Sequence, residues 1–172
     1  MGSTYVNNLR LEEMTTGEKS GTWGNITNVN LELVGQALGY GTRAIANAST
    51  DNITIADGAS DADRSMYLKL TGGGQACTVT LLPNTSSKMW IMENATSYTL
   101  TFSQGTGANV AIKAGQTKMI FADGLGGGAV VYELGTIAVQ NIQADGTVTV
   151  GIDDTGYDVT FFGATTGKKL FW

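Results

Sequence analysis

From about residue 50 onward, the chain is a succession of short β-patterned segments, each closed by Gly, Asn, Asp or Ser. Eight segments are expected to be strands: 52–56, 66–71, 77–82, 88–93, 98–103, 109–113, 117–122 and 129–134. In residues 98–102 (YTLTF) apolar and threonine side chains alternate, so one face is apolar and the other faces water. Such segments, spaced roughly 8 to 12 residues apart with turn signals between them, are typical of an antiparallel β-sandwich or barrel.

The glycine-rich connections 72–74, 105–107 and 124–128 are expected to supply the positive φ that tight hairpin turns need. We therefore predict a mainly β protein whose sandwich domain spans residues 41–135. A chain of 172 residues is long enough for one main core.

A helical pattern precedes the strands. From Trp23 onward, apolar residues recur at helical spacing: Ile26, Val29, Leu33, Ala37 and Leu38. Gly39 follows them as a helix stop signal. This spacing predicts one short N-terminal amphipathic helix of about 13 residues. Residues 1–22 have mixed polarity, and Leu9, Leu11 and Met14 are their strong apolar anchors. Residues 1–40 are thus predicted to form an arm and a helix.

The last segment, residues 136–172, is expected to be a C-terminal β extension with strands at 137–139, 147–152 and 158–162. A segment of this length is too short to bury a core of its own. It ends in Leu170, Phe171 and Trp172, which are expected to pack between subunits.

Composition excludes several partners. The net charge is −5, and the ten basic residues are scattered along the chain, so nucleic acid is not an expected partner. No apolar run reaches the roughly 18 residues of a membrane span, and a membrane is not expected either. Residues 1–6 lack the pattern of a signal peptide, which favours synthesis in a cytoplasm.

The chain also lacks the usual catalytic groups. It contains no histidine and one cysteine, Cys77, which lies in an alternating apolar run and is expected to be buried. Triads that use histidine, and zinc sites built from histidine or paired thiolates, are excluded. Glu12 and Glu13 are adjacent and point apart. We predict no enzyme activity, no catalytic residues and no cofactor.

Two acidic clusters could gather oxygen ligands around a calcium ion: Asp57, Asp61 and Asp63, and Asp153, Asp154 and Asp158. Neither follows a defined metal-binding spacing, and aspartate beside glycine is ordinary turn chemistry, so no metal site is predicted. The exposed aromatic residues could stack on sugars, although most are expected in the core or at subunit contacts. The residues considered are Trp23, Trp90, Trp172, Tyr5, Tyr40, Tyr98, Tyr132 and Tyr157.

Two parts of the chain are similar in sequence to known proteins. Residues 3–24 (STYVNNLRLEEMTTGEKSGTWG) and 28–33 (NVNLEL), with 110–118 (VAIKAGQTK) and 122–124 (ADG), resemble a module of virion structural proteins of tailed phages, notably marine podoviruses and myoviruses. Residues 146–151 (GTVTVG), 153–159 (DDTGYDV) and 161–164 (FFGA) resemble repeats of phage fibre proteins. The resemblance carries no catalytic residues.

The resemblance implies a virion protein made in the cytoplasm of a host bacterium, most simply a tail fibre or fibre-attachment protein that forms a homotrimer and contacts other proteins of the tail or capsid. In this interpretation the arm and helix dock through Leu9, Leu11, Trp23 and Ile26, and Leu170, Phe171 and Trp172 pack between subunits. Two alternatives remain open: a capsid decoration protein, and a receptor-binding module that recognises a glycan of the host surface.

Overall fold

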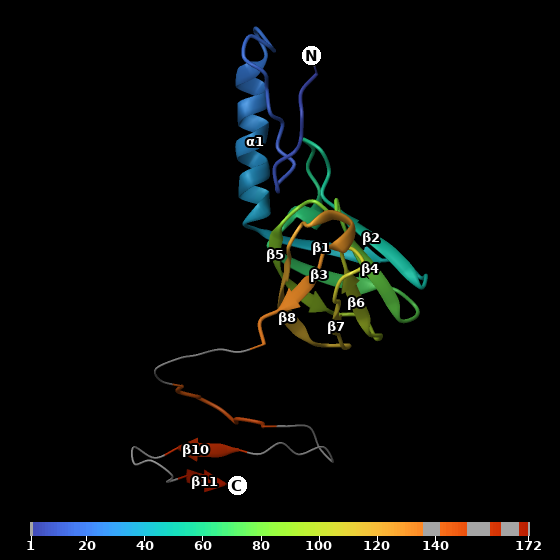
Figure 1. Ribbon diagram of the computed structural model, residues 1–172, viewed down its shortest axis with the longest axis vertical. Coiled ribbons are helices and arrows are strands. Elements are labelled where there is room, and N and C mark those ends of the chain that lie inside the picture. The colour runs from blue at the N-terminus through green and yellow to red at the C-terminus, as the bar shows by residue number, and fades with distance from the viewer. Residues whose placement is uncertain (1, 136–141, 151–158, 163–168, 172) are drawn as a thin grey trace. The chain divides into compact units, whose positions relative to one another are not determined.

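The computed structural model describes residues 2–135, 142–150, 159–162 and 169–171 (Figure 1). The chain divides into two compact units, Met1–Gly135 and Thr136–Trp172, which are considered separately.

The first unit contains one α-helix, nine strands and two short 3₁₀ helices. The elements are α1 (Trp23–Ala37), β1 (Tyr40–Ile45), β2 (Thr50–Thr54), η1 (Ala62–Arg64), β3 (Tyr67–Gly72), β4 (Cys77–Leu82), β5 (Lys88–Asn94), β6 (Leu100–Ser103), β7 (Val110–Ile112), β8 (Thr117–Ala122), η2 (Gly126–Gly128) and β9 (Val131–Glu133). The prediction of a mainly β chain with one short helix near its N-terminus is confirmed.

The strands form two mixed sheets. One sheet has five strands in the order β1-β3-β5-β8-β9, and the other has four in the order β2-β4-β6-β7. From β1 to β6, each strand therefore lies in the sheet opposite to that of the strand before it. The chain winds between the sheets, and three windings stack on one another: β1 with β2, β3 with β4, and β5 with β6 (Figure 1).

The sheets were predicted to be those of an antiparallel β-sandwich or barrel, and the antiparallel pairing is wrong for four of the strand pairs. β1 pairs with β3 and β3 with β5 in parallel, and so do β2 with β4 and β4 with β6. Only the last pairs of each sheet, β5–β8, β8–β9 and β6–β7, are antiparallel. Neither sheet of the described residues closes into a barrel. The physical reason is the winding, because the crossover between two parallel strands is a strand of the opposite sheet.

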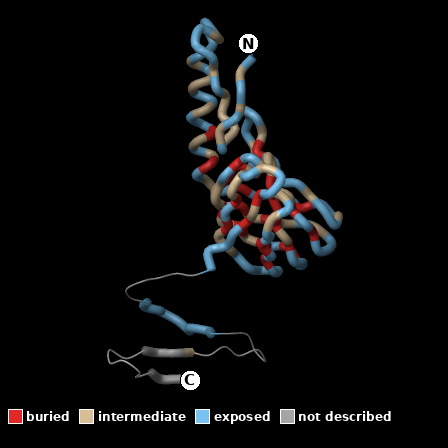
Figure 2. The backbone as a smooth tube through the Cα atoms, viewed as in Figure 1, coloured by how far each residue is buried: buried red, intermediate tan, exposed pale blue. Residues whose placement is uncertain are grey.

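Both sheets contribute to one hydrophobic core. Its fully buried side chains include Ile53, Leu68, Trp90, Phe102 and Ile120, from five different strands. Figure 2 shows that buried residues are concentrated among the strands, whereas α1 is buried only near its C-terminal end. There Leu33 and Ala37 are buried.

In the second unit, β10 (Thr160–Phe162) pairs antiparallel with β11 (Lys169–Phe171). The strand predicted at 158–162 is confirmed over residues 160–162. Residues 147–150 of the strand predicted at 147–152 carry no strand. The segment 137–139 lies outside the described residues.

Candidate interaction surfaces

The N-terminal arm is fixed to the strands by a buried arginine. The Arg64 side chain is fully buried, and its guanidinium donates to the carbonyls of Leu9, Ala56 and Ala59 and to the Asp61 carboxylate. Burial lowers the pKa of Arg64, and Asp61 opposes this effect. One guanidinium thus joins the arm to the 56–61 loop.

The first acidic cluster is divided among three arginines. Asp57 pairs with Arg10 at 2.6 Å, Asp61 with Arg64 at 3.2 Å and Asp63 with Arg43 at 3.0 Å. Asp63 also accepts from the Thr54 amide, and Asp61 accepts from the amides of Ala56 and Arg64. Each carboxylate therefore joins two segments of chain. No group of three or more metal-ligating side chains gathers among the described residues.

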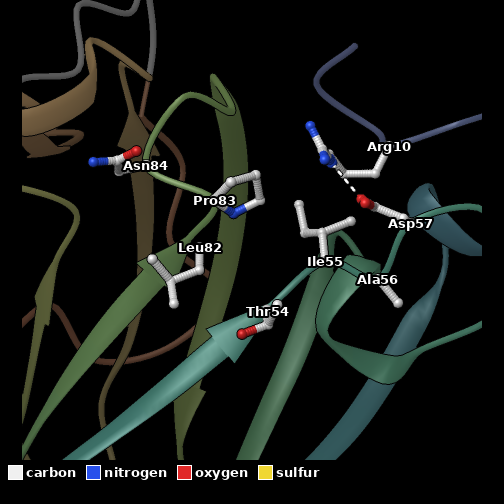
Figure 3. Close-up of a pocket in the computed structure, with 8 residues that line it drawn as sticks. All are labelled: Arg10, Thr54, Ile55, Ala56, Asp57, Leu82, Pro83 and Asn84. Carbon is white, nitrogen blue, oxygen red and sulfur yellow. Dashed lines mark hydrogen bonds and ion pairs between the residues drawn. The ribbon is translucent and has the colours of Figure 1, made fainter. Parts of the chain in front are cut away.

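A pocket of about 560 Å³ lies where the arm meets the ends of β2 and β4 (Figure 3). Ile55, Leu82 and Pro83 are its apolar lining, and the Arg10–Asp57 ion pair lies at one side. The remaining lining residues are Thr54, Ala56 and Asn84. Among the described residues, no aromatic side chain lines the pocket, and its one cationic group, Arg10, is paired with Asp57. The pocket therefore offers neither a stacking surface for a sugar nor an uncompensated charge for an anion.

The outward face of the five-stranded sheet is largely apolar. Strand register aligns two apolar rows on it: Tyr40, Tyr67, Ile91 and Met119 in one row, and Met89, Phe121 and Tyr132 in the other. We call these seven residues the apolar band. Tyr40 and Tyr132 are more than half exposed, and the Tyr40 and Tyr67 rings stack with centroids 5.5 Å apart. Such a continuous patch is unusual on a surface that faces only water.

A polar row borders the apolar band, and its charges are matched internally. It consists of Thr42, Lys69, Glu93 and Thr117 in register across four strands. The Lys69 ammonium lies 2.8 Å from Glu93, whose other oxygen accepts from the Tyr67 hydroxyl at 2.9 Å. These two hydrogen bonds lower the pKa of Glu93. The row therefore presents no unmatched charge to a partner.

The outward face of the four-stranded sheet has the opposite character. Its exposed or partly exposed side chains include Thr50, Thr78, Thr101 and Ala111, which are aligned in one row by the strand register. Threonine suits a pleated surface in contact with water without making it sticky. One outer face of the protein is therefore suited to solvent and the other to contact.

The helix carries a second exposed apolar surface. Leu31 and Leu38 are 65% and 67% exposed, and Val34 between them is partly buried. With Thr27 one turn earlier, these residues form a stripe, which we call the helix stripe. Trp23, 62% exposed, lies at the N-terminal end of the same helix.

The buried Cys77 and the partly buried Lys88 have shifted pKa values. Burial raises the pKa of the Cys77 thiol, which disfavours the reactive thiolate. Burial, together with repulsion from Arg64, lowers the pKa of Lys88 to about 8. The Lys88 ammonium lies 4.3 Å from the centre of the Trp90 ring and donates to the carbonyls of Ser65 and Met89.

The predicted interface residues differ in how far the structure buries them. Leu9, Leu11 and Ile26 are partly buried within the first unit, whereas Trp23 is exposed. Leu170 and Phe171 lie in β11, and their side chains, like the whole of Trp172, lie outside the described residues. Asp153, Asp154 and Asp158 of the second acidic cluster also lie outside the described residues. Whether these residues form an interface stays a prediction.

No protein-family model, curated protein or solved structure matches the chain. Among its described residues, no helix has the length and apolar character that crossing a bilayer requires.

Proposed function

We propose that this chain is a non-enzymatic structural protein of a phage virion, a tail fibre or fibre-attachment protein that assembles as a homotrimer. The observation that carries the proposal is the contrast between the two outer sheet faces, one lined by threonine and the other by the apolar band. The virion setting rests on the resemblance of residues 3–24, 28–33, 110–118 and 122–124 to tailed-phage virion proteins. It rests also on that of residues 146–151, 153–159 and 161–164 to phage fibre repeats.

A copy of the same chain is the partner that best suits the apolar band. Interface centres are enriched in aromatic residues and methionine and depleted of charge, and their rims are polar. The band has this composition, with Tyr40, Tyr132 and Phe121 exposed and the Lys69–Glu93 pair at its border. Since that pair is neutral overall, identical copies do not repel one another at this rim.

The mass of the protein in solution tests this proposal. Light scattering or native mass spectrometry should show a trimer of the 18.0 kDa chain. Tyr40→Lys with Tyr132→Lys should shift the protein towards monomer, because each substitution would place an ammonium group inside an apolar contact.

The control is Thr78→Lys with Ala111→Lys on the solvent-facing sheet, which should remain trimeric. A wild-type protein that stays monomeric at tens of micromolar would overturn the proposal. The virion assignment is tested separately by labelling purified phage particles with an antibody against this chain. Unlabelled particles from a phage that encodes the chain would contradict it.

A second candidate function, glycan binding, is favoured by one observation. The stacked Tyr40 and Tyr67 rings lie beside Lys69, Glu93 and Thr42, so a ring surface and hydrogen-bonding groups share one face. A glycan array tests it: saturable binding that is lost in Tyr67→Ala would favour a receptor-binding module, and the absence of binding to any glycan on the array would exclude that function for those sugars.

A further inference from the structure

The helix α1 uses only one side for contacts within its own chain. Leu33 and Ala37 are buried near η1. One turn closer to the N-terminus of the helix, the Asn30 side chain makes two hydrogen bonds to the arm. Its amide oxygen accepts from the Glu12 backbone amide at 3.0 Å, and its amide nitrogen donates to the Glu12 carbonyl at 2.9 Å. Figure 1 shows the helix and the arm extending together away from the strands. The helix is thus held in a fixed position while another side of it faces outward.

The helix stripe lies on that outward side, and its residues are spaced as in helices that pack against each other. Thr27, Leu31, Val34 and Leu38 are separated by four, three and four residues. This is the a/d spacing of helices that pack together through knobs-into-holes contacts. The side chains at the a-type positions, Leu31 and Leu38, are the ones left about two-thirds exposed. A stripe with this period fits the side of another helix.

We infer that the helices α1 of three copies pack in parallel around the symmetry axis through the helix stripe. The inference rests on the proposed function for the number of copies. Around a cyclic axis each helix meets its neighbours at the same level, so Leu31 of one copy lies near Leu31 of the next. The sheet contact alone is small: two rows across five strands cover roughly 300–400 Å², against about 800 Å² per partner in a stable interface. A second contact surface is therefore required, and the stripe supplies it.

Charge and continuity both favour a second copy as the occupant of the stripe. Glu32 is the one charged residue of α1, and it lies about 100° around the helix from Leu31, so three copies would bring little like charge together. The helix has no lysine or arginine of the kind that a membrane-surface helix uses to bind lipid headgroups. Leu38 is also two residues before Tyr40, so the stripe ends where the apolar band begins.

The helix stripe is too short to hold three subunits together by itself. From Thr27 to Leu38 it extends about 17 Å, and a helix contact of this length is marginal by itself in water. We therefore assign it the alignment of the three subunits, with the sheets adding contact area.

Disulfide cross-linking of the full-length chain tests the inference. Cys77 is the one native cysteine and is 3% exposed, so an introduced surface cysteine would be the accessible thiol. Leu31→Cys, after mild oxidation, should yield cross-linked dimers on a non-reducing gel. In a trimer, at most two of every three chains can be linked this way. Leu38→Cys provides the same readout one heptad later should Leu31→Cys fail to fold.

Glu32→Cys is the matched control, since it is exposed at the same level of the helix and points elsewhere. It should cross-link several-fold less. A trimeric protein in which neither stripe position cross-links more than Glu32→Cys would overturn the inference and leave the proposed trimer standing. A monomeric wild-type protein would overturn both, and the mass measurement separates the two outcomes.

Discussion

Single residues with non-local partners determine how the first unit is held together. Arg64 donates to the arm, to the 56–61 loop and to Asp61, although these groups are up to 55 residues apart in sequence. Its Nε is buried with no hydrogen-bond partner among the described residues. The sequence shows Asp57, Asp61 and Asp63 as one acidic cluster, but nothing local indicates that each pairs with a different arginine.

Arg64→Met should therefore be strongly destabilising. It would leave the Leu9, Ala56 and Ala59 carbonyls without their donor and Asp61 without its counter-ion, which should cost about 3 kcal/mol or more. Urea unfolding, followed by the fluorescence of buried Trp90, measures the change. Arg10→Ala is the control, because its ion pair with Asp57 is half exposed on the Asp57 side and should contribute less than about 1 kcal/mol. Similar losses for the two variants would contradict this account.

Lys88 should make stability increase with pH. Its pKa is lowered from 10.5 to about 8 in the folded protein. Between these two values the unfolded chain binds more protons than the folded one, so the free energy of unfolding rises as pH increases from 8 to 10. The gain should be at most about 3 kcal/mol. Lys88→Met should remove this rise in urea titrations at pH 7, 8.5 and 10, and a variant that retained the whole rise would assign it to other groups.

At the level of elements, the type of most segments in the first unit was predictable, but their pairing was not. The helix and the strands 77–82 and 117–122 lie where local patterns place them. β1 escaped prediction because its inward positions include Gly41 and Arg43, which break the apolar alternation. The parallel pairing was not predicted, because a short connection between two strands usually indicates an antiparallel hairpin. Here, from β1 to β6, each connection leads to a strand of the opposite sheet.

The glycine-rich connections were predicted to supply positive φ in hairpin turns, and only some of their glycines have positive φ. Gly72, Gly73, Gly124 and Gly126 have positive φ, but Gly105 does not and serves close packing instead. A Cβ at Gly105 would lie 2.7 Å from the Ala129 nitrogen and the Gly127 carbonyl oxygen. The loop after β6 is thus fitted directly onto η2.

Gly105→Ala should therefore destabilise the protein by about 1–3 kcal/mol, because backbone atoms would have to move apart. The midpoint of thermal unfolding measures this. Gly127→Ala is the matched control, since a Cβ there meets nothing within 4 Å and its φ is not positive. An equal loss in both variants would contradict the close contact at Gly105 as the cause.

At the level of the whole molecule, the sequence contains signals for the apolar band and for the helix stripe that the predictions above do not include. Met89-Trp90-Ile91-Met92 is a continuous apolar run, which is typical of a strand apolar on both faces. The predicted apolar pattern of the helix includes Ile26, Leu33 and Ala37 but not Leu31, which is 65% exposed. Apolar content is readable from a sequence, but the side left uncovered emerges only when the other elements are in place.

The winding of the chain between the two sheets also bears on its evolution. Tyr40 pairs with Tyr67 and Tyr67 with Ile91, so successive windings are offset by 27 and 24 residues. A winding in such a stack contacts chiefly the windings before and after it. Duplicating or deleting a stretch of about that length would therefore change the height of the stack while preserving the helix at one end and the closing antiparallel strands at the other. Related genes could vary in length by whole windings, with no new fold required.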